Sequence, residues 1–394
     1  MNLKTSKWLK YLAVFLALCA LICFTGCDNG ESESDLSSSD SSQTGEPENY
    51  HKVGFIFSES ADSLNFSSMI NDQRILASNR CNMDTCYIEN VSITEFENAV
   101  KMLASAGCTD IVSCSANFTN VCRIMAGKYL NLNFINYGAA SGSANTMAYT
   151  ELPYQGAYVA GLAAGYNTET RNVGIVLDSD LIYDTAVANA ITLGVQWVYK
   201  NSTTYIAEAH ADNDIESAIQ ALLNNGCDVI VTYTSSSHAE DYCQQKGVKF
   251  IGNHDFSGKE DAYDKMIMYY YCKRDSYFVA KFKQMQFDQW ASESYTGNMG
   301  NGVVTVSGAI NSRADLQKII DAIKLSISTG EAYIFDGKRE ELIDNNGIVK
   351  CLQGYELSES EIYNMDWYIR GSVDLGNFRK PHLDTPEVTL AVKE

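Results

Sequence analysis

Hydrophobic and polar positions along this chain form the same pattern twice. Residues 97–112 and 216–231 align without a gap, and each combines a helix with one apolar face, a Gly-Cys pair and an apolar strand. The apolar face recurs at the same spacing: Phe96, Val100 and Leu103 in the first copy, and Ile215, Ile219 and Leu222 in the second. The pattern predicts one helix–turn–strand unit used twice, with left-handed C-caps at Gly107 and Gly226.

The segments around this repeat alternate between strands and helices. Capping boxes are expected before the two repeated helices, at Thr94-x-x-Glu97 and Asn213-x-x-Glu216. Strands are expected at 52–57, 86–89, 110–114, 133–137, 172–178, 205–208, 228–233, 249–252 and 266–271. Further helices are expected at about 66–80, 120–129, 154–166, 184–199, 239–246, 276–290 and 311–328. This alternation predicts parallel α/β sheets.

The chain is expected to form two doubly wound parallel-sheet lobes. Residues 172–178 echo 52–57, so the pattern restarts there. We assign the lobes to 51–165 and 166–300, with a C-terminal segment at 301–394 completing them. The helix near 154–166 is rich in Gly and Ala and too short to span a membrane, which indicates a buried helix passing between the lobes. Ligands of open α/β sheets bind beyond the carboxyl ends of the strands, so a ligand cleft is expected between the lobes.

The first fifty residues are typical of a targeting segment rather than of a folded domain. Lysines precede an apolar stretch at 11–24, which ends in small residues before Cys27 and resembles a bacterial lipobox. We expect a signal peptide at 1–26, lipid on Cys27, and a disordered, acidic, Ser-rich tether at 27–50. A plain secretory signal with an incidental cysteine is the alternative.

Composition narrows the classes of partner. A formal charge of -20 in 394 residues argues against a nucleic-acid partner, which requires clustered Lys and Arg. Twelve cysteines are present, and nine remain after those of the leader and Cys27 are set aside, so internal pairing cannot be complete. Cys81 and Cys86 are spaced for pairing across a short loop, which spacing alone does not establish.

No catalytic or metal-binding motif is found in the sequence. It lacks a Cys-x-x-Cys, a His-x-x-x-His, a Gly-x-Ser-x-Gly elbow and a phosphate-binding glycine loop. Asp255 follows His254, but no nucleophile accompanies the pair. We therefore expect a protein that is not an enzyme and uses neither a cofactor nor a metal.

Aromatic residues near the predicted strand ends are the stronger candidates for a site. Flat apolar rings with a few polar neighbours suit a planar heterocycle or a sugar, although each ring is also suited to core packing. The candidates are Phe66, Phe118, Tyr270 and Tyr271.

From about His51 to Leu375 the chain resembles a known family. The resemblance is carried by segments at 52–57, 155–165, 189–194, 226–231, 246–252, 300–304 and 365–368. In these segments the chain is similar to the basic membrane protein family. This family consists of PnrA-like, purine-binding lipoproteins that serve as the substrate-binding proteins of ABC transporters, and the chain is most similar to its Med-like branch. The resemblance implies a periplasmic-binding-protein-like (type I) fold, with its lobes hinged around a purine nucleobase or nucleoside.

The resemblance also implies roles for individual residues. Residues 62–66 read Asp-Ser-Leu-Asn-Phe where the branch often carries Gly-Asp-His-Gly-Trp, which implies a base-stacking role for Phe66 with Asn65 beside it. The other implied ligand contacts are Ser115, Asn189, Asp255, Tyr270 and Tyr271.

We therefore expect a lipid-anchored protein on the extracytoplasmic face of the cell membrane. It would pass a purine base or nucleoside to an ABC permease. A receptor of the same fold for a sugar or other small solute is one alternative. A cleft enzyme such as a nucleoside hydrolase is another.

Overall fold

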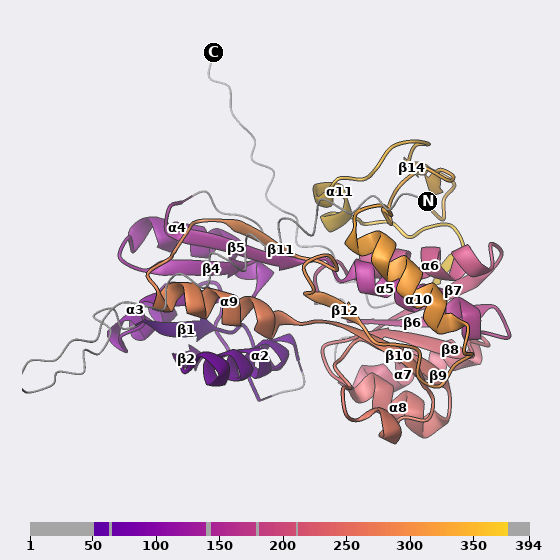
Figure 1. Ribbon diagram of the computed structural model, residues 1–394, viewed down its shortest axis with the longest axis horizontal. Coiled ribbons are helices and arrows are strands. Elements are labelled where there is room, and N and C mark those ends of the chain that lie inside the picture. Colours follow the sequence, from indigo (N-terminus) through magenta and orange to yellow (C-terminus); the bar gives the residue numbers. More distant parts are fainter. Residues whose placement is uncertain (1–50, 63–64, 139–142, 179–180, 210–211, 377–394) are drawn as a thin grey trace, which may run out of the picture. The chain divides into compact units, whose positions relative to one another are not determined.

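The structure is a computed structural model that describes residues 51–62, 65–138, 143–178, 181–209 and 212–376 (Figure 1). The chain divides into two units, Met1–Glu48 and Asn49–Glu394. The first unit holds the predicted signal peptide and Cys27 and lies outside the described residues. Within the described ranges, no helix is long and apolar enough to cross a membrane.

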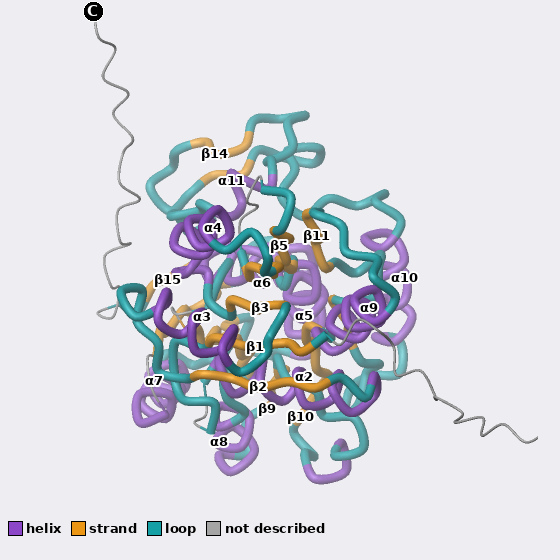
Figure 2. Tube along the Cα trace, turned by 90° about the vertical axis from the view of Figure 1, so that its left-hand side faces the viewer, coloured by secondary structure: helices purple, strands orange, loops and turns teal. Residues whose placement is uncertain are grey.

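A six-stranded parallel sheet forms the first lobe. Its strand order is β11-β5-β4-β3-β1-β2, so β1 lies between β3 and the edge strand β2 (Figure 2). Its strands are β1 (Lys52–Ile56), β2 (Asp84–Ile88), β3 (Asp110–Ser113), β4 (Asn133–Tyr137), β5 (Thr146–Glu151) and β11 (Ser294–Gly297). The helices on one face are α2 (Phe66–Cys81) and α9 (Arg274–Gln286), and those on the other are α3 (Phe96–Ser105) and α4 (Thr119–Lys128). Both faces are buried, which explains why β1 reads as a continuous apolar run.

A seven-stranded sheet forms the second lobe. Its order is β12-β10-β9-β8-β6-β7-β15, and only β12 runs antiparallel to its neighbour. Its strands are β6 (Asn172–Asp178), β7 (Thr203–Ala209), β8 (Val229–Tyr233), β9 (Lys249–Gly252), β10 (Met266–Cys272), β12 (Val304–Val306) and β15 (Ser372–Asp374). The helices packed on it are α5 (Tyr154–Asn167), α6 (Asp184–Val198), α7 (Asp212–Asn224), α8 (His238–Lys246) and α10 (Leu316–Ser328). The predicted class, with two parallel α/β lobes, is confirmed.

The repeated unit is present in both lobes, with one correction. Gly107 and Gly226 have φ of +87° and +77°, so both are left-handed as predicted. The capping boxes are wrong: α3 begins after Glu95 with no side-chain cap, and α7 begins at Asp212, so that Asn213 is already helical. Both helices therefore begin at residues other than those that the capping boxes predict.

The chain passes between the two sheets three times within the described residues: from β5 to α5, from β10 to α9 and from β11 to β12. The sheets therefore do not follow the expected boundaries at 165 and 300. α9 and β11 return to the first sheet, where Ser294 of β11 pairs with Ala148 of β5. α5 packs in the second lobe, because its small residues fit against α6.

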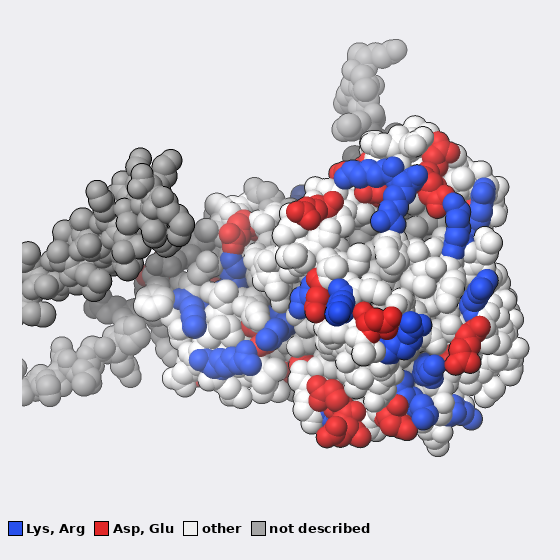
Figure 3. All heavy atoms as spheres, turned by 45° about the vertical axis from the view of Figure 1, so that its right-hand side comes forward, with Lys and Arg blue, Asp and Glu red and all other residues white. Residues whose placement is uncertain are grey.

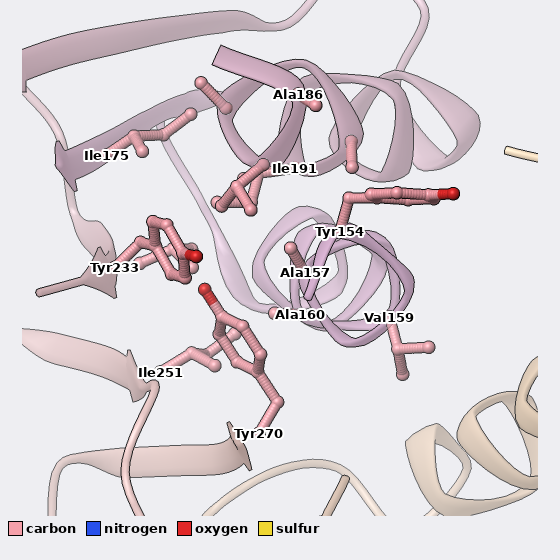
Figure 4. Packing of buried hydrophobic residues seen from close by; sticks show 14 of the residues in the cluster. Tyr154, Ala157, Val159, Ala160, Ile175, Ala186, Ile191, Tyr233, Ile251 and Tyr270 are labelled. Carbon is pink, nitrogen blue, oxygen red and sulfur yellow. The ribbon is translucent and has the colours of Figure 1, made fainter. Parts of the chain in front are cut away.

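The contact of α5 with α6 depends on glycine. A Cβ added at Gly161 would clash with the carbonyl oxygen of Ile191, and one at Gly194 would clash with that of Tyr158. Ala157 and Ala160 of α5 are fully buried in the hydrophobic cluster of this lobe, near Ile191 and Ile251 (Figure 4). α5 is therefore buried almost all round, in agreement with the predicted close-packed helix.

The C-terminal part wraps onto the second lobe. Its short elements are β13 (Leu342–Ile343), β14 (Val349–Cys351) and α11 (Glu359–Tyr363). Two 3₁₀ turns lie earlier in the chain, at Ala116–Phe118 and Glu260–Ala262. β15 then adds a parallel edge to β7, with Ser372 opposite Thr204. On the face drawn in Figure 3, acidic and basic side chains are interspersed rather than gathered into a basic patch.

Candidate ligand-binding site

The candidate site lies at the carboxyl ends of the parallel strands, where the polar loops of each lobe begin. In the first lobe, α2 follows β1 and the Ser115 turn follows β3. In the second lobe, the loop with His254 and Asp255 follows β9. These are the positions at which open α/β sheets bind ligands.

Phe66 lies where the two lobes meet. It is the first residue of α2, and its partly buried ring packs against the hydrophobic clusters of both lobes. The ring centroid is 5.1 Å from that of Tyr137, and the guanidinium carbon of Arg274 lies 5.4 Å from it. The neighbouring Asn65 caps α2: its side chain accepts from the Ser68 N–H at 3.0 Å and donates to the Ser60 carbonyl at 3.1 Å. Asn65 thus fixes where Phe66 sits.

A buried ion pair beside Phe66 was not found from the sequence. Glu151 ends β5, Arg274 begins α9, and their side chains form an ion pair with exposed fractions of 1% and 9%. The Tyr137 hydroxyl donates to Glu151 Oε1 at 3.3 Å and the Tyr149 hydroxyl donates to Oε2 at 2.5 Å. The available signals were a charged residue at the end of a strand, Glu151, and the charged run Lys273-Arg274-Asp275 directly after β10.

Arg274 keeps its charge in this environment. Burial lowers the pKa of Arg274, but the Glu151 carboxylate more than offsets this, and the pKa is raised. Burial and the same carboxylate raise the pKa of Tyr137, so its hydroxyl stays protonated as a donor. The Nε of Arg274 is buried and has no hydrogen-bond partner among the described residues. The site therefore holds one unused donor next to an aromatic ring.

Two predicted residues of the second lobe come together. Asp255 is exposed and accepts from the N–H of Ser257 at 2.9 Å. Burial and then the charge of Asp255, which also hydrogen-bonds Tyr271, raise the pKa of the partly buried Tyr271. Asp255 and Tyr271 thus form a polar–aromatic pair at the end of the sheet.

The adjacent His254 is held by Glu240. Its Nδ1 lies 3.0 Å from Oε1 of the fully buried Glu240. Burial raises the pKa of Glu240, but His254 and hydrogen bonds from Thr232 outweigh it, and the pKa is lowered. Among the described residues, no group of three or more metal-ligating side chains is found.

Three predicted contacts lie in the core instead. Phe118 is 1% exposed, and its ring centroid lies 4.9 Å from that of Phe96. Both rings belong to the hydrophobic cluster that α3 and α4 form with the first sheet. Tyr270 is 2% exposed, and its hydroxyl donates to the Thr232 carbonyl at 2.8 Å. Helical and strand periodicity cannot distinguish a buried ring from one at a strand end, which is why core packing was the alternative interpretation for each of these rings.

Asn189 is the third predicted ligand contact that lies in the core. Its amide donates to the Trp367 carbonyl at 2.7 Å and accepts from the Ile369 N–H at 2.8 Å, which fastens the C-terminal segment to α6. Ser115, in contrast, stays at the strand end, where its Oγ accepts from the Asn117 N–H at 3.3 Å and caps a 3₁₀ turn.

Comparison with known proteins identifies the family of this chain. Residues 50–333 match the family of PnrA-like ABC transporter substrate-binding proteins. The chain belongs to this family. It is 22% identical, over 74% of its length and 83% of the other protein, to a purine-binding protein of Brucella abortus (strain 2308).

Solved structures show the same fold. An ABC transporter solute-binding protein of Conexibacter woesei superposes with a TM-score of 0.60 at 17% identity, covering 72% of this chain and 98% of the other. One of Aeropyrum pernix K1 superposes with a TM-score of 0.62 at 14% identity, covering 71% and 92%. The predicted family and the periplasmic-binding-protein-like fold are both confirmed.

Proposed function

We propose that this family member captures a purine nucleobase or nucleoside between its lobes and delivers it to an ABC permease. The observation that carries the proposal is the position of Phe66, a partly buried ring that contacts the hydrophobic clusters of both lobes. A purine stacked on this ring gains about 1–3 kcal/mol, by analogy with base–aromatic stacking in nucleic-acid binding. The purine-binding name of the Brucella relative supports the ligand class.

Two polar groups complete the proposed site. Arg274 Nε–H donates to an acceptor atom of the ligand, which supplies the partner that this buried nitrogen lacks within the described residues. Asp255 accepts a hydrogen bond from a ring N–H or a ribose hydroxyl. Its exposure at the end of β9 leaves the carboxylate accessible.

The proposed location is the extracytoplasmic face of the cell membrane. Lipid on Cys27 holds the protein there, and residues 27–50 act as the tether. Metabolic labelling with a palmitate analogue tests this, because Cys27→Ala should abolish the label. Unchanged labelling of that variant would contradict the anchor.

Thermal stability with a panel of ligands tests the binding. A purine at about one hundred times its Kd stabilises a single-site protein by roughly 2.7 kcal/mol, which raises the Tm by several degrees. The nucleoside should be recovered intact, whereas a nucleoside hydrolase would release the free base. A rise in Tm with a sugar, and none with any purine, would contradict the purine assignment and would favour a sugar-type receptor of the same fold.

A further inference from the structure

A pair of cysteines lies in the first lobe, away from the strand ends of the candidate site. Cys86 is on β2, and Cys108 is in the turn between α3 and β3. Their sulfur atoms are 3.3 Å apart. Cys86 is partly exposed, whereas Cys108 is 3% exposed. Among the described residues, no other pair of cysteine sulfurs lies within hydrogen-bonding distance. Cys81 and Cys86, whose spacing left a pairing open, are both free cysteines in the structure.

A glycine brings the two sulfurs together. Cys86 is opposite Gly54 in the register of β1 and β2, so the two positions share a face of the sheet. A Cβ on Gly54 would lie 3.1 Å from the sulfur of Cys108. The sulfur of Cys108 therefore occupies space that the missing side chain leaves open, directly beside Cys86.

The second copy of the repeat provides an internal comparison. Cys227 follows the left-handed Gly226 as Cys108 follows Gly107, and it is 4% exposed. The strand glycine of that lobe is Gly174, but the residue opposite it on the edge side is Tyr205 rather than a cysteine. The same position thus holds a cysteine in both lobes, and only the first lobe supplies a partner.

We propose that Cys86 and Cys108 form a reversible disulfide when the protein meets an organic disulfide. The thiolate of Cys86 attacks one sulfur of the oxidant, forming a mixed disulfide and releasing one thiolate. Cys108 then loses its proton and attacks the Cys86 sulfur, and a second thiolate leaves. The two cysteine thiols are oxidised, and one organic disulfide is reduced to two thiols. The sulfurs must close from 3.3 Å to about 2.05 Å, which is within reach of side-chain rotation.

The environments of the two thiols set the order of these steps. Burial, and then the hydrogen bond and charge of Cys86, raise the pKa of Cys108 to about 12, so Cys108 carries little thiolate. Cys86 is the more accessible of the two. Attack therefore begins at Cys86, and Cys108 resolves the mixed disulfide because its sulfur is already adjacent.

The bridge would join the edge strand β2 to the turn before β3 and close a loop that contains α3. Cross-linking a loop of this kind restricts the unfolded chain and raises stability. The full mature protein should therefore melt about 5 °C higher after oxidation, and dithiothreitol should reverse the change.

Peptide mapping after treatment with oxidised glutathione tests the proposal. Trypsin cleaves after Arg80 and Lys101, and Asp-N cleaves before Asp84 and Asp110. The expected product is peptide 84–101 joined to peptide 102–109. Peptide 81–83 joined to 84–101, glutathione retained on Cys86, or an unmodified Cys86 would each overturn the proposal.

Two variants provide controls. Cys108→Ser should leave glutathione attached to Cys86 and abolish the rise in Tm. Cys227→Ser should form the same cross-linked peptide as the wild type. Loss of the cross-link in Cys227→Ser would overturn the assignment of the partner.

Discussion

Arg274 at the start of α9 forms a buried ion pair with Glu151 at the end of β5, so the pair joins two of the three segments at which the chain passes between the sheets. The backbone ties the third segment to the same place, since Leu152 N–H donates to the Gly297 carbonyl at 2.9 Å and Lys273 N–H donates to the Val303 carbonyl at 2.7 Å. The crossing segments therefore act as one connected support beside Phe66.

Removing one partner of the Glu151–Arg274 ion pair should strongly destabilise the fold. Arg274→Met leaves Glu151 buried without its counter-charge, so we expect a loss of about 3–5 kcal/mol in the free energy of unfolding, measured with urea. The exposed pair Lys200–Glu340 is the control, because Lys200→Met should cost less than about 1 kcal/mol. The double variant Arg274→Met/Glu151→Gln should recover part of the loss. Equal effects of Arg274→Met and Lys200→Met would contradict the burial of the pair.

Two phenylalanines should respond oppositely to truncation. Phe66→Ala should weaken purine binding by about 1–3 kcal/mol with a modest effect on stability. Phe118→Ala should lower the free energy of unfolding by about 3–5 kcal/mol, because its ring is buried between α3 and α4. Calorimetry of binding and urea unfolding separate the two effects. A Phe66→Ala variant with wild-type affinity would remove this ring from the site.

Asn189→Ala should loosen the C-terminal segment. The change leaves the Trp367 carbonyl and the Ile369 N–H without this partner and should cost about 1–3 kcal/mol. Trypsin should then cleave faster after Arg370. The exposed Asn98 on α3 is the control, since Asn98→Ala should leave the rate unchanged. Equal cleavage of the Asn189 variant and the wild type would argue against this fastening role.

Gly161→Ala should prevent α5 and α6 from packing as they do. The added Cβ would clash with backbone at Ile191, which cannot move as a side-chain end can. We expect several kcal/mol of destabilisation or failure to fold. Gly127→Ala in the exposed part of α4 meets nothing within 4 Å, so it should be neutral or stabilise by about 0.5–1 kcal/mol. Circular dichroism during thermal unfolding compares the two.

The contribution of His51 should depend on pH. Burial lowers its pKa, but the hydrogen bond and charge of Asp110, 2.8 Å away, outweigh this and the pKa is raised above 6.5. A raised folded pKa means that the stabilisation is complete below the unfolded value and is lost as pH rises through the folded value. The difference in unfolding free energy between wild type and His51→Gln should therefore be largest below the ordinary histidine pKa of about 6.5 and should shrink as the pH rises above it. A difference that grew with pH would contradict this assignment.

Much of the fold could be predicted because its signals are local. Apolar strands such as 172–178, separated by helices with one apolar face, are typical of parallel sheets, and Gly107 and Gly226 mark the ends of the repeated helices. The order of family segments along the chain also identified the family. Of the candidate site, Phe66 and Tyr271 were proposed from their positions near predicted strand ends, whereas Ser115 and Asp255 were implied by the family resemblance.

The tertiary structure alone decided which distant residues meet. Three contacts join residues that are far apart in the sequence, and no repeating pattern of hydrophobic positions links the partners. They are Glu151–Arg274, Asn189–Trp367 and Cys86–Cys108. Similarly, β11 returns to the first sheet because β5 offers it a free edge, although its own sequence is too short to indicate a sheet. Hydrophobic patterning specifies which face of an element is buried, whereas the partner that covers that face depends on how the whole chain packs.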